Sequence, residues 1–230
     1  MKTIGLIGGM SWESTQTYYQ LINQGIQTRL GGLHSAKIAL QSLNFAEIAQ
    51  LQKDGDWDAM AHILGEAAER LEKSGADVVM ICTNTMHKLA PEVAARLAIP
   101  LLHIADATAT AMASQGIKKV GLLGTAFTME HDFYRGHIQD KFGIEVVVPN
   151  KIDRDLVHQI IYSELCLGQV KATSKAEYLR IIDALGAKGA EGVILGCTEI
   201  GMLIKQKDTE VPLFDTTPIH AAAAVEFALA

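Results

Sequence analysis

The stretch GADVVMICTNT, residues 75–85, recurs in altered form as GAEGVILGCTE, residues 189–199. Each copy begins with a Gly-Ala pair, continues through an apolar run and ends in polar or thiol side chains. When the two copies are aligned from their first glycines, Thr83 falls opposite Cys197. A short apolar run next to glycine is typical of a parallel strand that is buried on both faces. The chain is therefore predicted to contain the same strand-and-loop unit twice.

Two further pairs of segments support an internal duplication. KTIGLIGGM (residues 2–10) matches KKVGLLGTA (residues 118–126), and IPLLHIADATATAM (residues 99–112) matches VPLFDTTPIHAAAA (residues 211–224). All three pairs occur in the same order in each half. Repetition in a conserved order is the mark of a duplicated architecture.

The secondary structure expected from the pattern is an alternation of short strands and longer amphipathic helices. Strands are predicted at residues 3–7, 38–43, 78–82, 100–104, 119–123, 145–148, 192–195 and 212–214. Helices are predicted at residues 56–73, 129–141, 154–167 and 174–188, among others. Such alternation indicates parallel sheets in an α/β fold.

We therefore expect two similar layered α/β domains with parallel sheets. Residues 1–106 with 209–230 are predicted to form the N-terminal domain, and residues 107–208 the C-terminal domain. Ligands of parallel α/β sheets bind beyond the carboxyl ends of the strands. The active site is accordingly expected in the cleft between the two domains.

Composition narrows the class of protein. The chain has 230 residues, 49% of them hydrophobic and 20% charged, which favours a packed core over disorder. The net charge is −6 and the basic residues are scattered, which argues against nucleic-acid binding. No apolar stretch approaches the length of a membrane span or of a signal segment. Three cysteines without framework spacing indicate a reducing compartment, so we expect a cytoplasmic protein without a membrane partner.

Cys197 has the position of a reactive thiol. It follows a glycine at a predicted strand end and precedes Thr-Glu at the expected start of a helix. A helix N-terminus lowers the pKa of a nearby thiol and favours the thiolate. The alternative is that Cys197 is a small buried apolar residue, which is the ordinary state of a free cysteine. We expect that ordinary state for Cys82 and Cys166.

Thr83 also allows two interpretations. Thr83, Asn84 and Thr85 precede an apolar helical pattern, and such residues commonly cap a helix. They can equally offer hydroxyl and amide groups to a carboxylate, as can Thr198 in the second half. Backbone N–H groups at such a turn bind anions as well.

Sequence motifs for a bound cofactor or metal are missing. GLIGGM does not match the GxGxxG pattern, and no GK[ST] follows it. The eight histidines include no HExxH motif. We therefore expect neither a cofactor nor a metal. His87 and His220 lie near predicted strand ends, where they can support a site or simply be satisfied structural residues.

Taken together, IGLIGGMSWEST, CTNTMH, GLLGTAFTM and GVILGCTEI resemble the aspartate/glutamate racemase superfamily, and most closely its bacterial aspartate racemase branch. The resemblance covers nearly the whole chain. It implies two similar Rossmann-like (flavodoxin-like) three-layer α/β domains, related by a pseudo-twofold duplication, with the active site between them. It also implies an isomerase acting on amino acids (EC 5.1.1 class) without pyridoxal phosphate or metal. It also makes a homodimer possible.

The resemblance assigns roles to particular residues. The family pattern has one cysteine in each half, whereas this chain has Thr83 in place of the first. The catalytic residues are then Thr83 and Cys197. The expected substrate-binding residues are Met10, Ser11, Gln52, Asn84, Thr85, Thr125, Thr198 and Glu199.

The replacement at position 83 has a chemical consequence. A thiol has a pKa of about 8.5, whereas an alcohol is far less acidic. Thr83 is therefore expected to deliver a proton, directly or through water, rather than to remove one. Since the second-half cysteine acts on the L-substrate in the family, we expect a preference for L-amino acids.

The resulting prediction is a cofactor-independent racemase of L-aspartate or L-glutamate. Three alternatives stay open from the sequence. The racemase can have broad or neutral side-chain specificity, for example for homoserine. A lone thiol also suits an isomerase or decarboxylase of small diacids, and carboxylate donors alone suit a non-catalytic amino-acid sensor.

Overall fold

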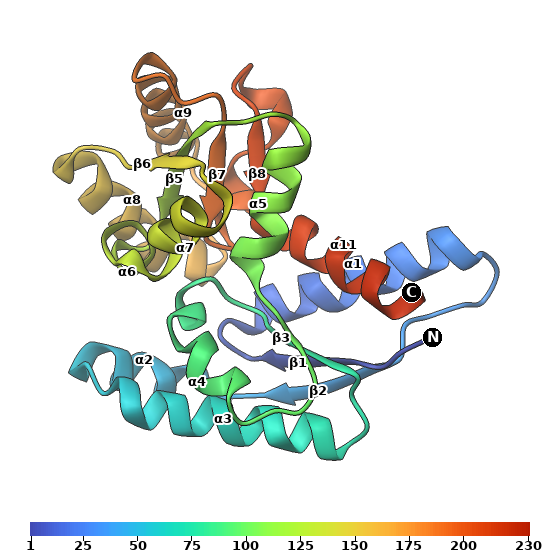
Figure 1. The fold of residues 1–230 in the computed structure, drawn as a ribbon. Helices are drawn as coiled ribbons and strands as arrows, with labels where there is room; N and C mark the ends of the chain where they lie inside the picture. The colour runs from blue at the N-terminus through green and yellow to red at the C-terminus, as the bar shows by residue number, and fades with distance from the viewer. The chain divides into compact units, whose positions relative to one another are not determined.

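The computed structural model describes all 230 residues and divides them into two compact units. Unit 1 comprises Met1–Ile104 and His220–Ala230, and unit 2 comprises Ala105–Ile219. Each unit contains a four-stranded parallel sheet flanked by helices (Figure 1). The strand order is β2-β1-β3-β4 in one sheet and β6-β5-β7-β8 in the other. The identical order confirms the predicted pair of similar parallel α/β domains.

Every predicted strand is present, with small differences at the ends. The strands are β1 (Ile4–Gly8), β2 (Ile38–Ser42), β3 (Val78–Ile81), β4 (Leu101–Leu102), β5 (Lys119–Gly124), β6 (Glu145–Val147), β7 (Val193–Gly196) and β8 (Leu213–Asp215). All residues of β1, β3 and β7 are buried. These strands are covered on both faces, which explains their continuous apolar runs.

Helices fill the connections between the strands. The α-helices are α1 (Trp12–Leu30), α2 (Phe45–Asp54), α3 (Trp57–Lys73), α4 (Ala90–Ala94), α5 (Ile104–Ser114), α6 (Ala126–Glu130), α7 (Asp132–Phe142), α8 (Lys151–Ser163), α9 (Ala172–Ala187), α10 (Ile200–Leu203) and α11 (Thr216–Leu229). Short 3-10 helices are η1 (Thr85–Leu89), η2 (Leu165–Leu167) and η3 (Gln206–Asp208).

Unit 1 has three layers, with α1 and α11 on one face of the sheet and α3 on the other (Figure 1). Side chains alternate between the faces along β1. Ile4 and Leu6 pack against α1 and α11, whereas Ile7 packs against α3. This period of two follows from strand geometry.

Unit 2 repeats the arrangement around β5, against which α8 and α9 pack. A Cβ atom on Gly121 of β5 would lie 2.8 Å from Leu185 of α9, so glycine allows the close approach of helix and strand. Glycine also allows close packing at position 192, where a Cβ atom would lie 2.7 Å from the Phe214 ring of β8.

Three features differ from the sequence-based expectation. β8 pairs with β7, so the chain returns to unit 1 at His220 rather than at residue 209. The helix expected over residues 129–141 is two helices, because the backbone at His131 is extended (φ −88°, ψ 150°). The helix expected over residues 154–167 ends as α8 at Ser163, and η2 follows.

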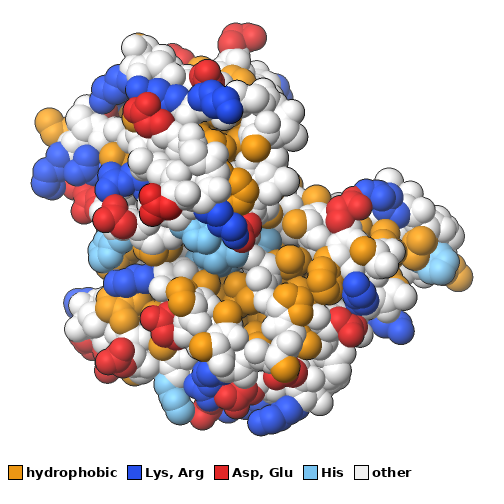
Figure 2. All heavy atoms as spheres, in the orientation of Figure 1, with side chains coloured by type: hydrophobic (Ala, Val, Ile, Leu, Met, Phe, Trp, Pro, Cys, Tyr) orange, Lys and Arg blue, Asp and Glu red, His pale blue; other side chains and the backbone are white.

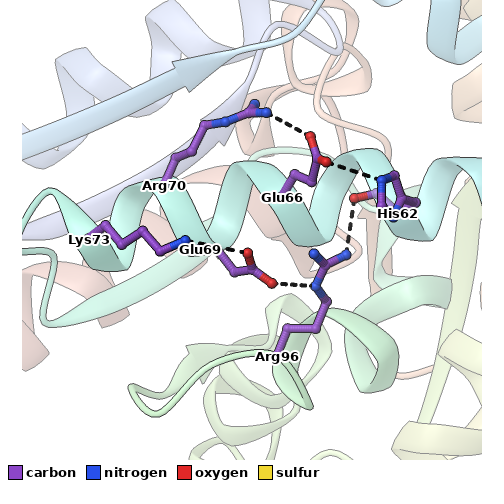
Figure 3. Close-up of polar contacts among 6 residues, drawn as sticks. All are labelled: His62, Glu66, Glu69, Arg70, Lys73 and Arg96. Atoms are coloured by element: carbon purple, nitrogen blue, oxygen red, sulfur yellow. Dashed lines mark hydrogen bonds and ion pairs between the residues drawn. The ribbon is translucent and has the colours of Figure 1, made fainter.

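An ion-pair network on α3 holds the segment that leads to β4 (Figure 3). Arg96 donates to the Glu69 carboxylate at 2.7 Å and to the His62 carbonyl at 3.3 Å. Glu72 accepts the backbone N–H groups of Ala98 and Ile99. The long helix thereby fixes the path of the chain just before it leaves unit 1.

Gly9, directly after β1, is a position where glycine is required. Its φ is +88°, and a Cβ atom would lie 2.1 Å from the Leu43 carbonyl oxygen. We expect Gly9→Ala to lower the free energy of unfolding by about 3 kcal/mol or more, because backbone strain and a backbone clash add. Gly55→Ala is the matched control, since Gly55 has φ +74° with open space around it. It should cost only about 1 kcal/mol in urea unfolding. Equal losses for both would contradict a role for the clash.

Charge is mixed over the visible surface. Figure 2 shows Lys and Arg interspersed with Asp and Glu, in keeping with the scattered basic residues of the sequence. None of the helices combines the length and apolar character needed to cross a bilayer.

Candidate active site

The predicted site residues of one unit are here called its half-site. In unit 1, most of them lie in the loops that follow two neighbouring strands. β1 and β3 are parallel and pair with Ile7 opposite Ile81. The loop after β1 carries Met10 and Ser11, joined by a cis peptide bond, and the turn after β3 carries residues 83–85. Because both loops leave the same edge of the sheet, the predicted residues that they carry lie at that edge.

Hydrogen bonds from α1 hold the loop after β1. Thr15 Oγ1 accepts the Gly9 N–H at 2.8 Å and donates to the Ser11 carbonyl at 2.8 Å. Ser11 caps α1 by accepting the Ser14 N–H at 3.2 Å. Ser14 Oγ in turn donates to the Cys82 carbonyl at 3.0 Å, which ties this loop to the end of β3. Hydrogen bonds through α1 therefore connect the two loops.

The turn after β3 presents Thr83 as its half-buried residue, between buried neighbours. Asn84 and Thr85 are 2% and 7% exposed and begin η1. Asn84 occupies the N-cap position without a side-chain capping bond. The Asn84 side chain therefore does not cap η1, although the sequence allowed that role.

Gln52 lies on α2 and is 6% exposed. Its Nε2 amide has no hydrogen-bond partner in the structure, although such a buried donor ordinarily has one. α2 packs through Ile48 into the same apolar core that contains Met10 and Met86. Gln52 is therefore an unused buried donor in the unit that carries Thr83.

The unit 2 half-site follows the strands β5 and β7. Gly124 and Gly196 are paired in register, so Thr125 and Cys197 leave adjacent points of the sheet edge. A Cβ on Gly124 would lie 2.9 Å from the Gly196 carbonyl oxygen, and glycines thus keep the two strand ends close. Thr125 caps α6 by accepting the Thr128 N–H.

Cys197, Thr198 and Glu199 form a compact hydrogen-bonded group. The Cys197 thiol donates to Glu199 Oε2 at 3.0 Å, and the Thr198 hydroxyl donates to the same oxygen at 2.7 Å. Cys197 and Glu199 are buried, at 8% and 6% exposure. Glu199 was expected to bind substrate, but the structure directs one of its oxygens at the thiol. The sequence shows only that the two residues are two positions apart.

The pKa of Cys197 is opposite to the expectation from its place before a helix. Burial raises the pKa of the Cys197 thiol well above its usual range, and the Glu199 carboxylate raises it further. α10 has only four residues, and it begins after Glu199. A short helix cannot outweigh desolvation and a neighbouring negative charge. The expected lowering was therefore wrong, and Cys197 rests as a protonated thiol that donates to Glu199.

The other two cysteines differ from each other. Cys82 is 1% exposed and packs in the core between the sheet and α1, where burial raises its pKa. It belongs to that core, as expected of a structural cysteine. Cys166 lies in η2 and is half-buried, so the expected full burial was wrong for it. A thiolate at Cys166 would also raise the pKa of Cys197, because the two negative charges repel.

Two groups of unit 2 that could serve as metal ligands, the Cys197 thiol and the Asp106 carboxylate, are engaged in hydrogen bonds. The Cys197 thiol retains its proton and directs it at Glu199. Elsewhere in unit 2, Asp106 is bound by His137 at 2.6 Å and by the Lys141 ammonium at 2.7 Å. The Lys141 ammonium beside the Asp106 carboxylate would compete with a bound cation.

Comparison with known proteins agrees with the geometry of both units. A family model for Asp/Glu/Hydantoin racemase matches residues 7–224. A putative Asp/Glu racemase from Yersinia pestis is 56% identical, with a TM-score of 0.95 over 100% of both chains. An aspartate racemase homologue from Pyrococcus horikoshii OT3 is 36% identical, with a TM-score of 0.88 over 100% of both chains. The broad specificity amino-acid racemase RacX of Bacillus subtilis (strain 168) is 22% identical over 99% of this chain and 98% of its own.

Two units with the same parallel strand order define a duplicated α/β protein. The chain belongs to the Asp/Glu/Hydantoin racemase family. It is an amino-acid racemase of that family, and the resemblance seen in the sequence is thereby confirmed.

Proposed function

We propose that the protein racemises L-aspartate or L-glutamate without a cofactor, with Cys197 removing the α-proton and the Thr83 side returning one. The observation that carries the proposal is the hydrogen bond from the Cys197 thiol to the buried Glu199 carboxylate. The proposal requires that one substrate is bound jointly by the two half-sites. Asn84, Thr85 and Thr198 would hold its α-carboxylate with hydroxyl and amide donors.

Glu199 would activate the thiol. A thiol with a raised pKa is a poor base until its proton leaves, and the Glu199 oxygen already accepts that proton at 3.0 Å. Transfer of the proton to Glu199 yields a thiolate beside a neutral carboxylic acid, so that two negative charges never lie side by side. The thiolate then takes the α-proton, and Glu199 releases its own proton to water.

Thr83 would act on the opposite face of the carbanion. Its hydroxyl gives a proton to the α-carbon and recovers one from water, directly or through a bridging molecule. An alcohol is far less acidic than a thiol, so almost none of the Thr83 hydroxyl is deprotonated at neutral pH and available as a base in the reverse direction. The two faces of the substrate therefore meet groups of unequal basicity.

Detailed balance limits how the preference for the L-isomer is expressed. The two enantiomers have equal free energies, so kcat/KM must be equal in the two directions. The preference therefore takes the form of a higher kcat, with a higher KM, for the L-isomer. It also appears as α-proton exchange without inversion, which the thiol can perform on the L-isomer alone.

Gln52 would select the substrate side chain. Its buried and unpartnered Nε2 group is a neutral donor for the distal carboxylate of aspartate or glutamate. The same donor suits a hydroxyl group, so homoserine and broad specificity are the alternatives that a substrate panel separates.

We further propose that the protein is a homodimer and that it is located in the cytoplasm. Light scattering tests the first proposal, and cell fractionation tests the second.

Substitution of Thr83 tests the proposed division of roles. With L-aspartate in D2O, Thr83→Ala should retain α-proton exchange while inversion falls by about 100-fold, the typical contribution of a general acid. Thr83→Cys should instead raise exchange from D-aspartate, because a thiolate then serves that face. Proton NMR measures the exchange and chiral chromatography the inversion.

Thr17→Ala is the control, since Thr17 is exposed on α1 and donates only within its own helix. Unchanged inversion in Thr83→Ala would contradict the role of Thr83. Loss of carbon dioxide from a small diacid, without exchange from any amino acid, would favour the decarboxylase instead.

A further inference from the structure

We infer that His87 is a positioning residue for Thr83, and that it couples the Thr83 turn to the segment by which the chain leaves unit 1. This inference rests on the proposed function, because it concerns the group that returns the proton. His87 lies in η1 and is 1% exposed, and every contact used below lies within unit 1.

Both ring nitrogens of His87 bind the backbone. Nδ1 lies 2.8 Å from the Thr83 carbonyl oxygen, and Nε2 lies 3.2 Å from the Ile104 nitrogen. A carbonyl only accepts and a backbone N–H only donates, so Nδ1 carries the proton and Nε2 accepts. The ring is therefore neutral and has one tautomer. Burial also lowers its pKa well below the usual range, and the nearby His103 and His220 lower it further.

A second histidine holds the same exit segment. His220 Nε2 lies 2.9 Å from the Leu102 carbonyl oxygen, and the Tyr18 hydroxyl lies 2.9 Å from His220 Nδ1. His220 is fully buried, and burial lowers its pKa to about 3. The segment from Leu102 to Ile104 is thus held at one carbonyl and one N–H by two neutral imidazoles.

The coupling follows from this arrangement. Thr83 and Ile104 are bound to opposite ends of one ring, whose orientation is restricted by the His103 ring at a centroid distance of 4.7 Å. Ile104 is the last residue of unit 1 before the chain passes into unit 2. A shift of the exit segment must therefore rotate the imidazole or break a buried bond to the Thr83 turn.

Two amide substitutions separate the two bonds of His87. The Nδ2 group of asparagine takes the place of Nδ1 and can still donate to the Thr83 carbonyl, but nothing reaches Ile104. The Oε1 atom of glutamine takes the place of Nε2 and can still accept from Ile104, but the donor to Thr83 is lost. His62→Gln is the control, because His62 is exposed on α3.

The readout is the number of inversions per α-proton exchange with L-aspartate or L-glutamate in D2O. His87→Gln should lower this ratio by about tenfold, the effect of one lost buried hydrogen bond. His87→Asn should stay within about threefold of the wild type. In a Thr83→Ala background, His87→Gln should have no further effect on the ratio. A purely structural role would lower exchange and inversion together in every background.

Equal ratios in the two His87 variants, or a full effect of His87→Gln in the Thr83→Ala background, would overturn the inference. A wild-type protein that performs no exchange would instead contradict the proposed function. Nitrogen NMR of the imidazole tests the geometry independently of activity. A protonated Nδ1 with an unprotonated Nε2 is expected, and the reverse tautomer would overturn the inference.

Discussion

Replacement of Cys197 by alanine is expected to lower both racemisation and α-proton exchange of L-aspartate or L-glutamate by at least about 1,000-fold. The Cys197 thiol lies against Glu199 and, once deprotonated, is the proposed carbon base. Thr198 donates to Glu199 at 2.7 Å and would satisfy that oxygen after the substitution. The fold should therefore persist, and a melting curve close to that of the wild type is expected.

Cys82→Ala and Cys166→Ala are the matched controls for this experiment. Cys82 lies in the core of unit 1, so its replacement should lower stability by about 1 kcal/mol and leave kcat nearly unchanged. Cys166 is half-buried in η2, and its replacement should also preserve turnover. Exchange that survives in Cys197→Ala would contradict the assignment of the base. Loss of exchange in Cys82→Ala would indicate that Cys82, and not Cys197, is the base.

Glu199→Gln is expected to have two effects of opposite sign. Racemisation should fall by about 100-fold to 10,000-fold, because the amide cannot take the thiol proton. The pKa of Cys197 should fall, because the negative charge that raises it has been removed, although burial still holds it above the usual range. A lower pKa means more thiolate at a given pH, so alkylation of Cys197 by iodoacetamide should become faster.

The opposition between these two results makes the test specific. A variant that had merely misfolded would lose turnover and would also expose Cys82 to labelling. Glu210→Gln serves as the control, since Glu210 is an exposed residue of unit 2. A Glu199→Gln enzyme that racemises at the wild-type rate, or that is alkylated more slowly at Cys197, would contradict the role proposed for Glu199.

The strands were predictable because their residues obey a simple rule. β1, β3 and β7 are buried on both faces, and each appears in the sequence as an apolar run that ends in glycine or a polar residue. The boundary at His220 was not predictable in the same way. It depends on the pairing of β8 with β7, which is a tertiary contact. The break at His131 has no proline or glycine to mark it.

The places of Thr83 and Cys197 in the fold were predictable, but the electrostatics around Cys197 were not. The alignment of the two repeats places Thr83 and Cys197 at equivalent strand ends, and the structure puts each of them there. The pKa of Cys197 depends on burial and on the rotamer that brings Glu199 Oε2 within 3.0 Å of the thiol. The bonds of His87 likewise depend on Ile104, a residue distant in the chain. Neither contact follows from local sequence spacing.

The most direct measurement follows the α-proton of four substrates in D2O with the wild-type protein and no added cofactor. L-Aspartate and L-glutamate should lose the α-proton signal, with more exchange events than inversions. D-Aspartate and D-glutamate should exchange only as they invert. Equal exchange without inversion from both enantiomers would contradict the unequal roles of Cys197 and Thr83, and no exchange from any of the four would contradict the proposed reaction on these substrates.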